Sequence, residues 1–130
     1  MQAKTITILL AVLFLFPSCE KQEGKGGKST IQGTVYQNVY DNSGNFVVKE
    51  EAREVNVYII YGESGVYDDN MDTHYDGTYE FKYLYPGTYK LFAYSECDSC
   101  PSNTVAVEVS LQITDKNETV VAPEIVVDNI

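Results

Sequence analysis

The sequence has little positive charge, no tryptophan and a single histidine. Nine Lys and Arg stand against 19 Asp and Glu, which gives a net charge of −10, and the basic residues form no cluster. Because phosphate contacts need Lys and Arg, this composition argues against nucleic-acid binding. Any Ser-His-Asp or Cys-His arrangement would have to use His74, and no phosphate-binding glycine loop or His-Glu-x-x-His sequence occurs. We therefore expect a protein that is not an enzyme.

The sequence also lacks an apolar run long enough to cross a bilayer as a helix, which takes about 20 residues. The apolar run at residues 6–16 follows Lys4 and has only eleven residues, which is typical of a signal peptide. It leads into Ser18 and Cys19, and a small residue followed by cysteine at this place resembles the lipobox of bacterial lipoproteins. The resemblance implies that residues 1–18 are removed, that Cys19 is acylated, and that the lipid anchors the protein to the outer membrane. An ordinary signal peptide with a free Cys19 is the alternative, and the periplasmic or cell-surface side of the membrane is left open.

Large apolar residues are absent from residues 20–29 (EKQEGKGGKS), which contain three glycines. Such a segment has nothing to bury, so we expect residues 19–29 to form a flexible tether that begins with the lipidated cysteine. The remaining residues, 30–130, have the length of one domain. We expect this domain to be monomeric.

Helical periodicity is missing from this domain, and apolar residues alternate with polar ones instead. The clearest example is TVAVEVSLQI, residues 104–113, which predicts a strand with one face on a core. A last strand is predicted near residues 120–127, at an edge or with a bulge, because Pro123 has no amide donor. Short strands separated by turn residues indicate an all-β sandwich.

Residues 76–94 (DGTYEFKYLYPGTYKLFAY) predict two strands joined as a hairpin by a turn at Pro86-Gly87. In the second strand, alternation directs Tyr89, Leu91 and Ala93 to the core and turns Phe92 and Tyr94 outward.

This segment also carries a resemblance to a known family. The residues concerned are Ile31-x-Gly33-x-Val35, then Val55-x-Val57, then Asp76-Gly77-x-Tyr79-x-Phe81-x-x-Leu84-x-Pro86-Gly87-x-Tyr89-x-Leu91. The pattern resembles the carboxypeptidase regulatory-like domain. The resemblance implies a seven-stranded antiparallel sandwich of the transthyretin-like (prealbumin-like) kind, immunoglobulin-like in outline, and a role as an accessory or binding module. The related B-type repeats of bacterial adhesins form Lys–Asn or Lys–Asp cross-links with the help of a Glu, but Ala93 stands at that Glu position, so we expect no such bond.

Cys97 and Cys100 admit three interpretations. In an exported protein we favour a disulfide that closes the loop after the Tyr94 strand. A redox-active or free thiol pair is the second. The third is a zinc site that adds His74 and Asp72, because the predicted hairpin would bring their segment to the same end of the sandwich.

Eleven tyrosines are many for a chain of this length. They suit half-buried strands, but an exposed aromatic group would suit a protein partner or sugar rings. The candidates on outward positions are Phe92, Tyr94, Tyr58 and Tyr36.

From these observations we expect a lipid-anchored, non-catalytic module of the cell envelope that recognises an envelope protein or a glycan and needs no cofactor. The alternatives are a metal-binding or thiol-redox site at the cysteine end and a structural subunit of an envelope assembly.

Overall fold

The computed structural model describes residues 22–130, so the predicted signal peptide and Cys19 lie outside the described residues. The elements in this part of the chain are β1 Lys25–Tyr40, β2 Phe46–Glu51, β3 Asn56–Tyr61, β4 Asp69–Asp72, β5 Thr78–Leu84, β6 Gly87–Glu96, the 3₁₀ turn Pro101–Asn103, β7 Thr104–Ile113, β8 Thr119–Val121 and β9 Ile125–Asn129. No helix within residues 22–130 has the length and apolar character needed to span a membrane.

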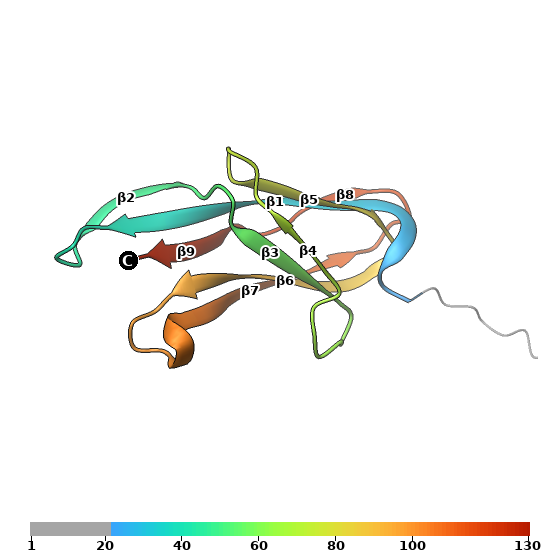
Figure 1. Ribbon diagram of the computed structural model, residues 1–130. Helices are drawn as coiled ribbons and strands as arrows, with labels where there is room; N and C mark the ends of the chain where they lie inside the picture. The colour runs from blue at the N-terminus through green and yellow to red at the C-terminus, as the bar shows by residue number, and fades with distance from the viewer. Residues whose placement is uncertain (1–21) are drawn as a thin grey trace, which may run out of the picture.

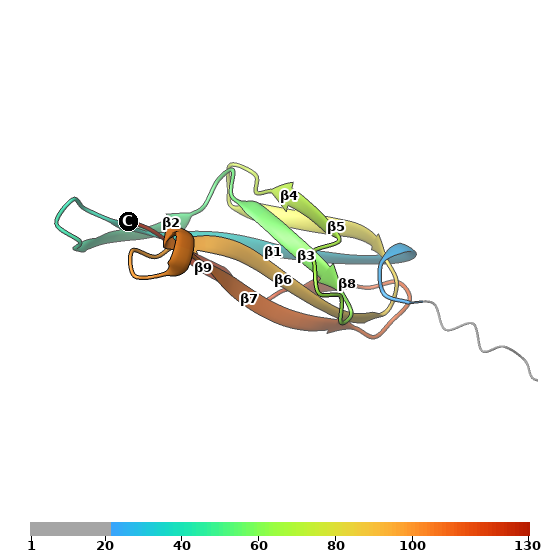
Figure 2. The same ribbon diagram turned by 60° about the horizontal axis from the view of Figure 1, so that its bottom comes forward.

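The strands form two sheets that face each other, and both views show this arrangement (Figures 1 and 2). In the five-stranded sheet the long strand β1 pairs with β5 and β8 along its first half and with β2 and β9 along its second half. The other sheet has the order β4-β3-β6-β7 and is antiparallel throughout. The hairpin of β1 and β2 extends beyond the end of the four-stranded sheet (Figure 1).

The core lies between the sheets and is built from alternate residues of their strands, as the sequence pattern predicts. Tyr89, Leu91 and Ala93 of β6 are fully buried there, opposite Ile31 and Tyr79 of the other sheet. The remaining core residues are Val35, Ala52, Val57, Ile59, Phe81, Leu84, Ile113, Ala122, Ile125 and Val127. The all-β sandwich expected from the sequence is therefore confirmed.

The predicted hairpin of residues 79–84 and 88–94 is wrong, because β5 and β6 do not pair. β5 pairs with β1, whereas β6 pairs with β3 and β7 in the opposite sheet. The turn at Pro86-Gly87 carries the chain across from one sheet to the other, with Gly87 in a positive-φ conformation (149°) that favours glycine. Both strands have an apolar face, and packing these faces against each other buries more apolar surface than pairing their edges would.

The predicted seven antiparallel strands also need correction. The described residues form nine strands, and β8 and β9 both run parallel to β1. They take the place of the single last strand that was predicted near residues 120–127. The break between β8 and β9 falls at Pro123, where the sequence predicted an irregularity, and the amide of Ala122 donates to Gln32 O at 2.8 Å. Parallel pairing is possible here because the chain returns to β1 only after passing through the other sheet.

Residues 25–29, predicted as part of a flexible tether, belong to the folded domain instead. Residues 25–29 belong to β1, and Ser29 is fully buried. Its hydroxyl donates to Asp115 O at 3.0 Å and accepts from the amide of Glu118 at 3.1 Å. Gly27 lies so close to the backbone of Leu84 that a Cβ atom would overlap it. The glycines that suggested flexibility instead permit close backbone packing.

Candidate binding site on the outer face of the four-stranded sheet

Four aromatic side chains gather on the face of the four-stranded sheet that points away from the core. We call Tyr58, Tyr67, Phe92 and Tyr94 the aromatic patch. The rings of Tyr58 and Phe92 are stacked, with centroids 4.8 Å apart and planes 9° from parallel. Tyr94 meets both of them edge-on, at 5.7 Å from Tyr58 and 5.6 Å from Phe92, and Tyr67 meets Tyr58 edge-on at 4.8 Å.

Strand register explains why these rings meet. Tyr58 on β3 lies directly opposite Phe92 on β6, and Tyr94 follows two residues later on the same face. Tyr67 comes from the loop before β4, which folds back along β3. The amide of Asp68 donates to Ile59 O at 2.8 Å, and the Asp68 carboxylate accepts from the amide of Tyr61 at 2.8 Å. This loop therefore holds the Tyr67 ring beside Tyr58.

The patch is not part of the core, and its members differ in exposure. Phe92 is only 9% exposed because other rings of the patch cover it, although it lies outside the core cluster. Tyr94 is 52% and Tyr67 is 51% exposed. The stacked pair thus forms a base, and the two outer tyrosines present ring surface and hydroxyl groups to solvent. Apolar surface offered to water in this way is typical of a binding surface.

Polar groups border the patch on the β4 side. Asn56 Nδ2 donates to Asn70 Oδ1 at 3.2 Å and to Asp72 Oδ1 at 2.8 Å, which orders a row of three side chains next to Tyr58. Asn56 Oδ1 is buried and has no hydrogen-bond partner among the described residues. This border offers oxygen acceptors beside aromatic rings.

The β7 side of the patch has a different border. Glu108 lies opposite Phe92, Ala106 lies opposite Tyr94, and Ser110 lies opposite Lys90. Lys90 is the one cationic residue within strands β3, β4, β6 and β7. The face therefore combines an aromatic centre with carboxylates on both of its sides.

Three of the four aromatic residues selected from the sequence are brought together, and Tyr36 is not. Tyr36 lies on β1 in the opposite sheet, where the Lys49 ammonium is 4.8 Å from its ring centroid. Lys49 also forms an ion pair with Glu124 at 2.9 Å. Sequence reasoning missed Tyr67, because a tyrosine in a polar loop carries no alternation signal that would place it on a face.

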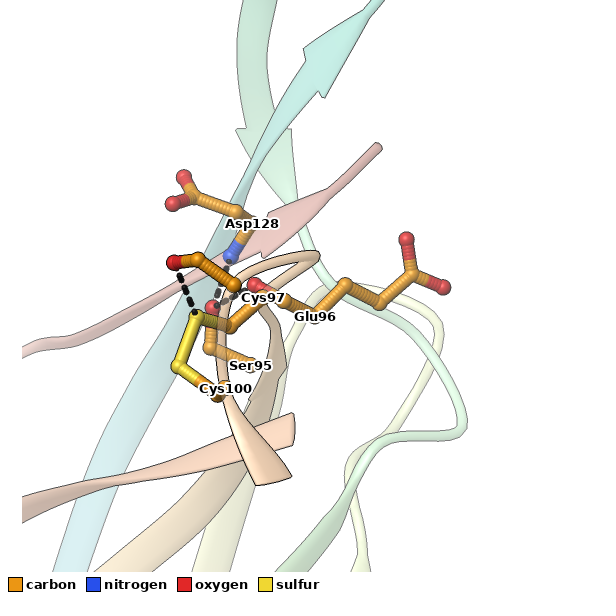
Figure 3. The surroundings of a disulfide bond; sticks show 6 residues. Ser95, Glu96, Cys97, Cys100 and Asp128 are labelled. Carbon is orange, nitrogen blue, oxygen red and sulfur yellow. Dashed lines mark hydrogen bonds between the residues drawn. A yellow bond between two sulfur atoms is a disulfide. The ribbon is translucent and has the colours of Figure 1, made fainter. Parts of the chain in front are cut away.

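Cys97 and Cys100 are joined by a disulfide in the hairpin between β6 and β7, with Cα atoms 5.4 Å apart (Figure 3). Cys97 Sγ and Ser99 Oγ are 3.7 Å apart across the same turn. Just before the turn, the Ser95 hydroxyl accepts from the amide of Asp128 at 2.7 Å, and so ties the end of β6 to β9. This end of the sandwich is closed by covalent and hydrogen bonds.

The four residues proposed as zinc ligands do not form a site. Both cysteine sulfurs are used in the disulfide, and within residues 22–130 no group of three or more His, Cys, Asp or Glu side chains could hold a metal ion. Asp72 accepts from Asn56 instead, and His74 lies in the turn before β5. The expectation failed because it relied on a β5–β6 hairpin, whereas these strands belong to different sheets.

No protein-family model matches this chain, and no curated protein matches it. It is similar to the crystal structure of a "putative carbohydrate binding protein" from Pseudomonas aeruginosa, with a TM-score of 0.48 and 12% identity over 82% of this chain and 91% of that one. At this level of likeness no property of that protein carries over to this chain. The resemblance to the carboxypeptidase regulatory-like domain stays a prediction.

Proposed function

We propose that this chain is a non-catalytic binding module of the cell envelope that recognises glycans through the aromatic patch. The observation that carries the proposal is the stacked pair of Tyr58 and Phe92 with Tyr94 and Tyr67 standing half-exposed beside it. The ring faces of sugars carry C–H groups that pack against aromatic surfaces, and their hydroxyls need hydrogen-bond partners at the rim. Specific ligand sites combine these two elements, a mainly apolar surface and a few placed polar groups.

The size of the patch favours a glycan over a protein partner. A stable protein–protein interface covers about 800 Å² on each partner and involves roughly 20–30 residues of each. Here the aromatic surface consists of four side chains and is bordered at once by amides and carboxylates. Such an area matches a few sugar rings.

We further propose that an acyl chain on Cys19 anchors the protein to the outer membrane. Residue 22 enters the domain at the end opposite the disulfide hairpin, as both views show (Figures 1 and 2). Glu23 contacts Gly87 there, at the start of β6. Phe92 and Tyr94 follow five and seven residues along that strand, so the patch would stand roughly 17–24 Å from the anchored end. That position leaves it accessible to a ligand beside the membrane.

Binding of the purified full chain to a panel of polysaccharides tests the proposal. Wild-type protein should be retarded in affinity electrophoresis by at least one polymer, and Tyr58→Ala and Tyr94→Ala should weaken that binding by about tenfold or more. Tyr75→Ala is the matched control, because Tyr75 is an exposed tyrosine in the β4–β5 loop and outside the patch. Binding that survives both patch substitutions unchanged would contradict the proposal, as would capture of an envelope protein by the patch with no retention by any polysaccharide.

A further inference from the structure

We infer that the aromatic patch selects uncharged pyranose sugars, and that a sugar stacks on the ring of Tyr94, beside its cross-strand neighbour Ala106. This inference rests on the proposed glycan-binding function and specifies its ligand. It combines three features of the outer face: which ring is open, which charges surround it, and which hydrogen-bonding atoms remain available.

Tyr94 is the ring with the most open surroundings among those on the strands of the patch. Tyr58 and Phe92 cover each other by stacking, whereas Tyr94 meets both only edge-on, at interplanar angles of 73° and 81°. Its cross-strand neighbour on β7 is Ala106, whose methyl group is too short to cover an aromatic ring. A flat sugar face can therefore approach Tyr94 from the β7 side.

The charges around the patch disfavour an acidic sugar. Asp72 borders it on β4 and Glu108 on β7, while Lys90 is the one cation within the four strands of this sheet. The whole chain carries a net charge of −10, which adds a repulsive field for anions. A uronate or a phosphorylated sugar would bring a like charge close to two carboxylates, and salt would weaken this repulsion.

The hydrogen-bonding atoms favour a ligand rich in hydroxyl donors. Asn56 Nδ2 donates to Asn70 Oδ1 and to Asp72 Oδ1, and the second oxygen of Asp72 accepts no hydrogen bond within residues 22–130. Glu108 adds two more carboxylate oxygens on the other side. Neutral sugars carry several hydroxyls that can donate to such oxygens, whereas a carboxylated sugar adds acceptors.

The experiment compares ligands that share one backbone. Full-length protein is titrated with dextran, mannan and galactan, and then with the carboxymethylated form of whichever polymer binds. We expect the neutral form to bind at least about tenfold more tightly at about 20 mM salt, and the difference to shrink at about 500 mM. Glu108→Gln should reduce the difference in affinity between the neutral and the carboxymethylated polymer at low salt. Equal or tighter binding of the carboxymethylated polymer would overturn the charge selection.

The stacking position is tested with Ala106→Leu, which places a branched side chain beside Tyr94 without removing any ring. We expect at least about a tenfold loss of binding to the neutral polymer. Ser110→Leu is the matched control on the same strand and the same face, and it should bind like wild type. Tyr94→Phe keeps the ring and should retain binding, which separates stacking on the ring from hydrogen bonding by its hydroxyl group.

The outcomes distinguish failure of the glycan-binding function from failure of the stacking position at Tyr94. If wild-type protein binds no polysaccharide, the proposed function itself fails. If binding depends on Tyr94 but is unchanged in Ala106→Leu, the glycan function stands and the stacking position is wrong.

Discussion

Tyr58 is predicted to stabilise the domain as well as to form its binding surface. Replacing it with alanine removes three ring contacts: the stacked one with Phe92 and the edge-on ones with Tyr67 and Tyr94. Each aromatic pair contributes about 0.5–1.5 kcal/mol beyond the area it buries, and the substitution also uncovers Phe92. Because neighbouring contacts are not additive, we expect Tyr58→Ala to lower the free energy of unfolding by about 2–4 kcal/mol.

Urea denaturation followed by circular dichroism measures this effect. With a slope of about 2 kcal/mol/M for a small domain, the midpoint should fall by about 1–2 M while the slope stays unchanged. Tyr94→Ala loses only two edge-on contacts of a half-exposed ring, so its cost should be about 1 kcal/mol. Tyr58→Phe keeps all three ring contacts and is the matched control. A cost of Tyr58→Ala below that of Tyr94→Ala would refute the assignment of Tyr58 to the base of the patch.

Three further predictions concern the rest of the domain. Gly27→Ala should destabilise the protein by about 1–3 kcal/mol in the same urea assay, because a Cβ would overlap the Leu84 backbone, whereas Gly65→Ala, where a Cβ meets open space, should change little. The ion pair of Lys25 and Asp69 (2.8 Å) holds the pKa of Asp69 below its usual value, chiefly through the hydrogen bond from Lys25. The contribution of this ion pair to stability is therefore present above the unfolded-state pKa of Asp69 and is lost as the pH falls through the lower folded-state pKa. The urea midpoints of wild type and Asp69→Asn should converge in acid. A difference between the two midpoints that stays constant down to the lowest pH would contradict this. Cys97 and Cys100 should react with a maleimide only after a reductant is added, and labelling without reductant would show that the disulfide is absent. The double substitution Cys97→Ser/Cys100→Ser should lower the free energy of unfolding by at most about 2 kcal/mol, because the bridge closes a very short loop.

Alternation in the sequence predicted the faces of the strands well. The run at residues 104–113 is β7, and Tyr89, Leu91 and Ala93 enter the core as expected. The same alternation placed Phe92 and Tyr94 on the outer face of β6, where they form the patch with Tyr58. This success has a physical basis, because burial of one face of a strand depends on local spacing alone.

The neighbours of each strand could not be predicted in the same way. A turn at Pro86-Gly87 can join two paired strands or carry the chain from one sheet to the other, and only the packing of the whole domain decides between them. Tyr83 is spaced to continue the buried face of Tyr79 and Phe81, but it adopts a positive φ of 61° and is exposed, while Leu84 turns inward. The burial of Ser29 likewise depends on Asp115 and Glu118, which are distant in the sequence.

The site itself was predictable only in part. Its strand residues follow from alternation, but the meeting of Tyr58 with Phe92 needs the β3–β6 register, and Tyr67 needs the fold of its loop. The zinc hypothesis failed for the same reason, since it assumed a strand pairing that the sandwich does not contain.

Amide chemical shifts during titration with a neutral polysaccharide fragment test the central claim most directly. If the aromatic patch binds glycans, the largest shifts in the full chain should fall on Tyr58, Phe92 and Tyr94 and on Ala106 on the neighbouring strand. Tyr94→Ala should then need about tenfold or more fragment to reach the same shifts. Shifts confined to the β1–β2 hairpin or to the disulfide turn, with the outer face of the four-stranded sheet unchanged, would contradict the account.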